Sequence, residues 1–214
     1  KDTLAPQALW QAVICFSEEF DAFADPADGR DKERVMEGLV ARFKDHPDTD
    51  NIFYLQGRTL ENQRKLVEAP AKYQSVPERA TAHEAALVRA GYCLRADAFR
   101  QYSAYMKAGK KDPAAEQAML DQLKKAEDLF KKFLKRVETV QVDDPEQKRA
   151  RTSLVLAVNQ ELAYLYNHKL VGKAAESLKF LNEVAKDIPQ DDERMAKIHQ
   201  VQMQSHLVLN QAEQ

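Results

Sequence analysis

Two glycines, 34 residues apart, constrain the fold of this chain more than any other feature of its sequence. Gly57 and Gly91 each lie within a stretch of helical periodicity, four residues after a large apolar residue and three before a leucine. Those neighbours are Phe53 and Leu60, then Leu87 and Leu94. A small residue inside a helix lets a second helix approach closely. A feature repeated at this interval therefore predicts an array of helical units, each covering the apolar face of its neighbour.

Helical periodicity covers nearly the whole chain, and no segment alternates with the period of a strand. Only 6 Gly and 8 Pro interrupt 214 residues, which argues against a β-sandwich of this length. We expect helices at about 7–24, 30–45, 50–61, 62–75, 79–108, 112–139, 145–168, 172–187 and 191–212. Asp112-Pro113 and Asp144-Pro145 predict two helix starts, because Asp caps the free N–H groups and Pro suits the first turn.

The residues after Gly57 extend the pattern to a second helix. Ala69 follows twelve residues later, then Tyr73, Val76 and Pro77. A similar frame recurs at Leu162, Ala163 and Tyr166, followed by Ala174, Leu178 and Leu181. This arrangement resembles the tetratricopeptide repeat. The resemblance implies an all-α superhelix of antiparallel hairpins forming one domain over residues 1–214. The hairpins would span about 7–47, 50–77, 79–140 and 145–189, with a terminal helix at 191–212.

One hairpin departs from the repeat length. Ala126, Phe130 and Phe133 match the second helix expected after Gly91, but they arrive 23 residues late. Both helices of that hairpin must be extended, so we expect it to protrude from the array.

The resemblance also implies where a partner would bind, because the first helix of each pair lines the concave surface of such arrays. Eight residues beside the packing positions are the candidate partner-binding strip: Tyr54, Arg58, Arg89, Tyr92, Arg95, Tyr164, Asn167 and His168. Glu61 and Gln160 lie in the same frame. Tyr and Arg are enriched in binding hot spots, and Arg can hold a carboxylate through two hydrogen bonds. The hypothesis is an exposed strip that binds an extended peptide or helix carrying acids. The alternative is that these tyrosines pack between neighbouring hairpins.

Some members of the family hold a C-terminal carboxylate with Lys and Asn at fixed concave positions. The matching places here carry other residues: Tyr54 and Arg58, Val88 and Tyr92, Gln160 and Tyr164. This clamp is therefore not reproduced.

Charge argues against nucleic acid as the partner, since 32 bases and 34 acids give a net charge of -2. Acids gather at 17–33 and bases at 107–136. We interpret both runs as solvated helix faces, with attraction between subunits or an acidic ligand on the basic hairpin as alternatives. No apolar run approaches the roughly 20 residues that a membrane span needs. The chain lacks a signal peptide and an initiator Met, so we expect a processed product or a piece of a longer protein. Compartment and oligomeric state stay open.

No constellation predicts catalysis, a cofactor or a metal. Cys15 and Cys93 lack metal-ligand spacing, and we expect buried free thiols, with a disulfide left open. His199 and His206 are seven residues apart, too far for one metal without other ligands, and are expected at the surface. We predict a non-catalytic scaffold or adaptor that binds a protein or peptide. The alternative is a helical regulatory or ligand-binding domain of a larger, possibly enzymatic, protein.

Overall fold

A computed structural model describes residues 5–23, 26–43, 46–109, 112–186, 188 and 193–212. This part of the chain is helical and contains no strand, which confirms the all-α prediction. None of the helices described is both long enough and apolar enough to cross a membrane. The acidic run at 17–33 lies partly outside the described side chains, and Lys110 and Lys111 lie outside the described residues.

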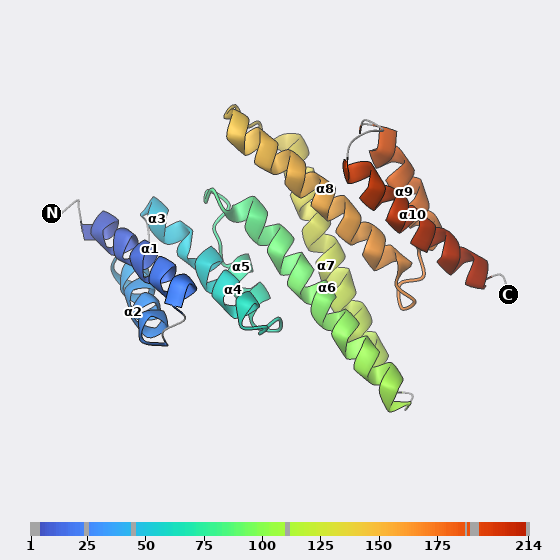
Figure 1. Ribbon diagram of the computed structural model, residues 1–214, viewed down its shortest axis with the longest axis horizontal. Helices are drawn as coiled ribbons and strands as arrows, with labels where there is room; N and C mark the ends of the chain where they lie inside the picture. Colours follow the sequence, from blue (N-terminus) through green and yellow to red (C-terminus); the bar gives the residue numbers. More distant parts are fainter. Residues whose placement is uncertain are drawn as a thin grey trace. The chain divides into compact units, whose positions relative to one another are not determined.

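The chain divides into two compact units, Lys1–Ala86 and Leu87–Gln214, with the division in the first turn of one helix. Figure 1 labels the helices in chain order. The first unit contains α1 (Ala5–Phe23), α2 (Pro26–Phe43), α3 (Pro47–Asp50), α4 (Ile52–Asn62) and α5 (Ala69–Gln74). The second contains most of α6 (His83–Ala108), and α7 (Pro113–Thr139), α8 (Pro145–Asn167), α9 (Ala174–Lys186) and α10 (Glu193–Ala212). The single superhelical array over residues 1–214 stays a prediction.

In the first unit, α1 and α2 pack against each other and against the start of α4. Their shared core contains four fully buried apolar side chains: Val13, Met36, Leu39 and Ile52. Helix α2 begins at Pro26, four residues earlier than predicted, and Gly29 lies inside it. Helix α1 ends at Phe23 and a new helix begins at Pro26, because proline at the first helical position loses no hydrogen bond.

The α4–α5 hairpin places Gly57 against the ring of Tyr73. A Cβ atom added to Gly57 would lie 2.6 Å from two ring carbons of Tyr73, so only glycine permits this approach. Tyr73 is buried, and its hydroxyl donates to Glu61 Oε2 at 2.6 Å. The sequence pattern placed Gly57 and Tyr73 on successive helices, and the structure brings the two residues into contact.

The second helix of this hairpin begins later than predicted, at Ala69 rather than at about 62. Arg64 adopts a left-handed conformation with φ of 60°. The Arg64 N–H donates to Glu61 O at 2.8 Å, and the Lys65 N–H donates to Leu60 O at 2.9 Å. These two bonds form a Schellman motif, which ends α4 and turns the chain away. Glycine usually marks that position, so the arginine gave no signal of it.

The longer α6–α7 hairpin has the same kind of contact between a glycine and an aromatic ring. A Cβ atom added to Gly91 would lie 2.6 Å from a ring carbon of Phe130, which is fully buried. Towards the turn, Gln122 Nε2 donates to Leu94 O at 3.0 Å, and the Tyr105 hydroxyl donates to Glu116 Oε1 at 2.5 Å. These contacts establish an antiparallel pair along most of both helices. The structure thus packs the helix of Phe130 against the helix of Gly91. That this hairpin protrudes from a repeat array stays a prediction.

The predicted helix starts at Pro113 and Pro145 are also correct. Asp112 Oδ1 accepts from the N–H groups of Ala114 and Ala115 at 3.0 and 3.2 Å. Asp144 Oδ1 accepts from the Gln147 N–H at 2.8 Å. Gly109, just past α6, has φ of 65°, the left-handed conformation expected of a helix C-cap.

Helices α8, α9 and α10 enclose a core in the second unit. Ala163, Leu181, Met195, Ile198 and Val201 are buried together. Ser177 of α9 donates to Ala163 O at 3.3 Å and lies 3.1 Å from the hydroxyl of Ser205 on α10. The bond from Ser177 to the Ala163 carbonyl thus holds α9 against α8.

Candidate functional site

The predicted strip is divided between the two units: Tyr54 and Arg58 belong to the first unit and the other candidates to the second. The second part carries most of the predicted residues. It lies on α6 and α8, the first helices of two successive hairpins.

Arg95 of α6 forms an ion pair with Glu161 of α8, 66 residues along the chain. The two side chains are only 13% and 18% exposed. The expectation that Arg95 is exposed is therefore wrong, because Glu161 holds it between the two helices. A pair removed from water in this way is already compensated, and an acidic ligand would have to compete with Glu161 for Arg95.

Planar side chains continue from this ion pair along α6. The Arg95 guanidinium carbon lies 5.4 Å from the ring centre of Tyr92 and 5.0 Å from that of Phe99. Phe99 stacks on His168, with ring centres 4.2 Å apart and planes at 17°. His168 meets the ring of Tyr102 edge-on at 4.7 Å. We call Tyr92, Arg95, Phe99, Tyr102 and His168 the aromatic row.

Burial within the aromatic row lowers the pKa of His168, and the positive charge of Arg95 lowers it further. The ring is therefore neutral at pH 7. The Leu170 N–H donates to Nδ1 at 3.3 Å, which leaves the proton of the neutral ring on Nε2. His168 thus acts as a flat, uncharged ring that connects α6 to the end of α8.

Tyr92 is the most exposed member of the aromatic row, with 36% of its surface accessible. The other four members are partly buried. The aromatic row therefore presents the ring of Tyr92 to solvent, beside four side chains that their contacts hold in place.

The remaining candidates of the second unit have other environments. Tyr164 packs against the core between α8 and α10, as the alternative interpretation of the tyrosines predicted. Asn167 is partly buried, and neither its amide nitrogen nor its amide oxygen has a hydrogen-bond partner among the described residues. Arg89 lies partly exposed on α6.

The two candidates of the first unit gather around Tyr73. The rings of Tyr54 and Tyr73 are tilted, with centres 5.6 Å apart. A hydrogen bond with Tyr54 raises the pKa of Arg58, which keeps its positive charge beside Glu61. This part of the strip is a small polar and aromatic cluster at the close contact between α4 and α5.

A buried carboxylate on α7 was missed by the sequence analysis. Glu127 Oε1 accepts from Lys131 Nζ at 2.6 Å and from the Tyr166 hydroxyl at 3.0 Å, and Lys173 Nζ lies 3.7 Å away. Burial opposes the charge of Glu127, but the bonds from Lys131 and Tyr166 outweigh it and lower the pKa. Burial and Glu127 raise the pKa of Tyr166 to about 12. Glu127 and Lys131 are four residues apart on one helix, but nothing in the sequence pointed to Tyr166.

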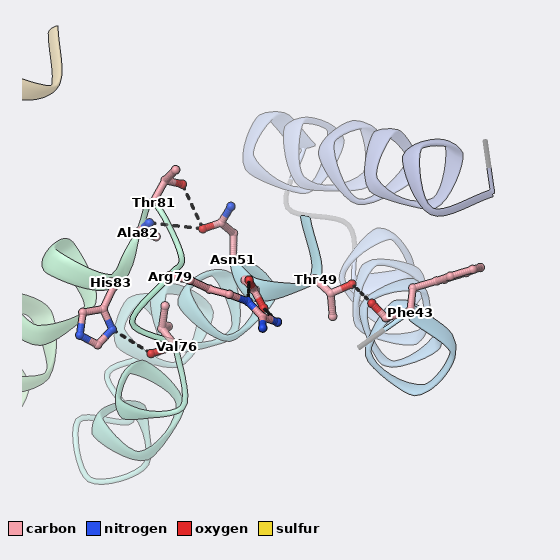
Figure 2. Close-up of polar contacts among 9 residues, drawn as sticks. Phe43, Thr49, Asn51, Val76, Arg79, Thr81, Ala82 and His83 are labelled. Atoms are coloured by element: carbon pink, nitrogen blue, oxygen red, sulfur yellow. Dashed lines mark hydrogen bonds and ion pairs between the residues drawn. The ribbon is translucent and has the colours of Figure 1, made fainter. Parts of the chain in front are cut away.

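A second polar cluster, in the first unit, also escaped prediction (Figure 2). Arg79 holds Asp50 through two hydrogen bonds of 2.7 and 3.0 Å. Asn51 Oδ1 accepts from the Ala82 N–H at 3.3 Å, and His83 Nδ1 donates to Val76 O at 2.9 Å. These bonds hold the start of α4 against the segment that follows α5, which is a structural role.

Both cysteines are free thiols, with Cys93 buried and Cys15 exposed. The expected burial is correct for Cys93 and wrong for Cys15, because the other face of α1 carries Val13 into the core. His199 and His206 are exposed as predicted. Within the described ranges, no three His, Cys, Asp or Glu side chains are grouped to hold a metal ion.

A cavity of about 430 Å³ lies between the start of α9 and the end of α10. Lys169, Lys173 and Glu176 line its polar side, and Val208 and Leu209 line its apolar side. Lys173 also faces Glu127 and lies over the ring of Tyr166, which accounts for its position.

Comparisons of the chain with protein-family models, curated proteins and solved structures give no match.

Proposed function

We propose that this chain is a non-catalytic helical-repeat scaffold that binds a protein or peptide partner through the first helices of its hairpins. The observation that supports this most is the repeated contact of glycine with an aromatic ring. Gly57 with Tyr73 and Gly91 with Phe130 follow the frame that resembles the tetratricopeptide repeat. Arrays built this way present the first helices as a binding surface.

The aromatic row is the proposed binding surface of the second unit. Tyr92 offers an accessible ring with a polar tip, a combination that is enriched at the centres of interfaces. Its neighbours are already held by the Arg95–Glu161 pair and by the stacking of Phe99 on His168. Side chains ordered before binding lose less entropy when the partner arrives.

The ion pair changes the chemistry proposed for the partner. Because Glu161 compensates Arg95, an acidic group gains little at that position. We therefore propose that the partner places an apolar or aromatic side chain on Tyr92.

Affinity capture with the immobilised full chain tests this proposal. Wild type is compared with Tyr92→Ala and with Met106→Ala, a control on the same helix that is 56% exposed. Quantitative mass spectrometry is expected to show a protein recovered in stoichiometric amount by wild type and by Met106→Ala. Tyr92→Ala should reduce its recovery about tenfold or more, the loss typical of a hot-spot tyrosine.

Circular dichroism melts of all three proteins complete the test, because they separate lost binding from lost folding. Equal recovery of every protein by Tyr92→Ala and wild type would contradict the proposed surface. The alternative, a ligand-binding or regulatory domain of a larger protein, stays a prediction.

A further inference from the structure

The ring of His168 joins the end of α8 to α6. It stacks on Phe99, with ring centres 4.2 Å apart and planes at 17°. It also meets the ring of Tyr102 edge-on, with centres 4.7 Å apart. Phe99 and Tyr102 are three residues apart on α6 and are therefore neighbours on one face of that helix. A single ring thus contacts two successive residues of this face.

The backbone of His168 also organises the turn that leads from α8 into α9. Its carbonyl oxygen accepts from the N–H groups of Val171 and Gly172, each at 2.9 Å. The Leu170 N–H donates to the ring itself, at Nδ1, over 3.3 Å. Leu170 and Val171 pack against the core of the second unit. One residue therefore holds both the shape of the α8–α9 turn and the contact of that turn with α6.

These contacts require the neutral form of the ring. Nδ1 accepts a hydrogen bond, so a proton on Nδ1 would turn this acceptor into a donor and break the bond from Leu170. The charge of a protonated ring would also be held away from water, which is unfavourable. Stacking on Phe99 attracts a cation and moderates this cost without restoring the lost bond.

The charged and titratable groups around the ring do not favour its protonation. Helix α6 contributes Tyr102 and Arg95, whose guanidinium carbon lies 5.0 Å from the ring centre of Phe99. Helix α8 contributes Glu161, which is bonded to Arg95. Lys169, the next residue along the chain, is exposed and adds a positive charge. Burial, and then the charge of Arg95, lower the pKa of His168.

We propose that His168 is a pH-sensitive contact, and that protonation of its ring in mild acid separates the α8–α9 turn from Phe99 and Tyr102 of α6. A histidine released from the contact takes up a proton more readily than one held in it. The contact is therefore complete above the ordinary histidine pKa of about 6.5 and weakens as the pH falls below that value.

Release of the ring would also disorder the aromatic row, because Phe99 and Tyr102 would lose a packing partner. A partner bound to Tyr92 would then bind more weakly in acid. This consequence rests on the proposed function. The contact itself is tested on the chain alone, so the two proposals can fail separately.

An NMR titration of the full chain tests the contact directly. The ring protons of His168 are followed from pH 8 to 5, and their midpoint should lie below the ordinary value of about 6.5. Cross-peaks from this ring to the rings of Phe99 and Tyr102 should weaken at least twofold below the midpoint, relative to the cross-peak between Gly91 and Phe130. A midpoint at or above 6.5 would overturn the proposal. Undiminished cross-peaks to α6 from the protonated ring would overturn it too.

A variant that cannot titrate gives a second test. His168→Phe keeps a flat ring, and His206→Phe is the control because His206 is exposed on α10. From pH 7.5 to 5.5, the unfolding constant in urea should rise about two- to tenfold more for wild type than for His168→Phe, tenfold being roughly the limit for one such histidine. The other histidines are common to both proteins, so their contributions cancel.

His206→Phe should keep the pH dependence of wild type. An equal rise for wild type and His168→Phe would contradict the proposal. If His168→Phe does not fold, the titration and the cross-peaks of the wild-type chain decide the question by themselves.

Discussion

The short α4–α5 hairpin and the long α6–α7 hairpin share a glycine–ring contact and a Tyr–Glu hydrogen bond between their helices, and they differ in length. Helix α4 continues five residues past Gly57 to Asn62, whereas α6 continues 17 residues past Gly91 to Ala108. The glycine and its ring stay together in both hairpins. The α6–α7 hairpin is therefore longer than the α4–α5 hairpin on the side of its turn, and the contact between glycine and ring is the same in both.

The added length is held by polar contacts that the short hairpin lacks. Asp97 is buried and accepts from Gln101 at 2.6 Å on its own helix and from Gln122 of α7 at 3.1 Å. Asp112 caps α7, while Glu68 at the start of α5 makes no side-chain cap bond. The comparison indicates that the close contact sets the helix pair, and that caps and buried polar bonds stabilise its extension.

The largest effect is expected from Phe130→Ala. This side chain is fully buried against Gly91, and removing a buried phenylalanine ring typically costs about 3–5 kcal/mol. Urea unfolding followed by circular dichroism measures the change in the free energy of unfolding. Met106→Ala, at an exposed site of the same hairpin, should change it by less than about 0.5 kcal/mol. A loss from Phe130→Ala no larger than that of the control would contradict the packing described.

Gly91→Ala should have the next largest effect. It should lower the free energy of unfolding by about 1–3 kcal/mol, because the added methyl group overpacks against Phe130. In the Phe130→Ala background the same change should stabilise by about 0.5–1 kcal/mol, because alanine favours a helix over glycine. Gly38→Ala in α2 is the control, since nothing lies within 4 Å of its added Cβ, and it should stabilise in either background. The same denaturation curves report all these changes. An effect of Gly91→Ala with the same sign in both backgrounds would refute the contact.

A smaller effect distinguishes the two helix starts. Asp112→Ala removes two capping bonds and should destabilise by about 1 kcal/mol. Glu68→Ala removes no side-chain cap bond, so its effect should be close to zero. Thermal melts of both variants at the same pH compare the two. Equal losses would show that the extended hairpin does not depend on its cap.

The structure and the sequence agree where a local pattern carries the information. The spacing of Gly57 and Gly91 identified the positions of close helix approach, and the Asp-Pro pairs located two helix starts, because each depends on neighbours along one or two helices. The Arg95–Glu161 pair joins residues 66 positions apart on different hairpins, and no short pattern encodes such a pair. The late start of α5 depends on the left-handed Arg64, a conformation that arginine rarely signals.

The smallest expected effect is a pH dependence confined to the second unit. The bonds from Lys131 and Tyr166 lower the pKa of Glu127 despite its burial. Its stabilisation is therefore complete above the ordinary carboxyl pKa of about 4.3 and is lost as pH falls through the folded value. The difference in stability between wild type and Glu127→Gln should shrink as the pH falls from 6 towards 3, a range chosen around that ordinary value. A difference that stays constant over this range would contradict the assignment.

The most direct test of the repeated contact is a nuclear Overhauser experiment on the full chain. We predict cross-peaks from the Gly57 Hα protons to the Tyr73 ring and from the Gly91 Hα protons to the Phe130 ring, although 16 residues separate the first pair and 39 the second. Both glycines should also show Hα resonances displaced by the ring currents. Cross-peaks from Gly57 without any between Gly91 and Phe130 would contradict the claim that the two hairpins share one contact.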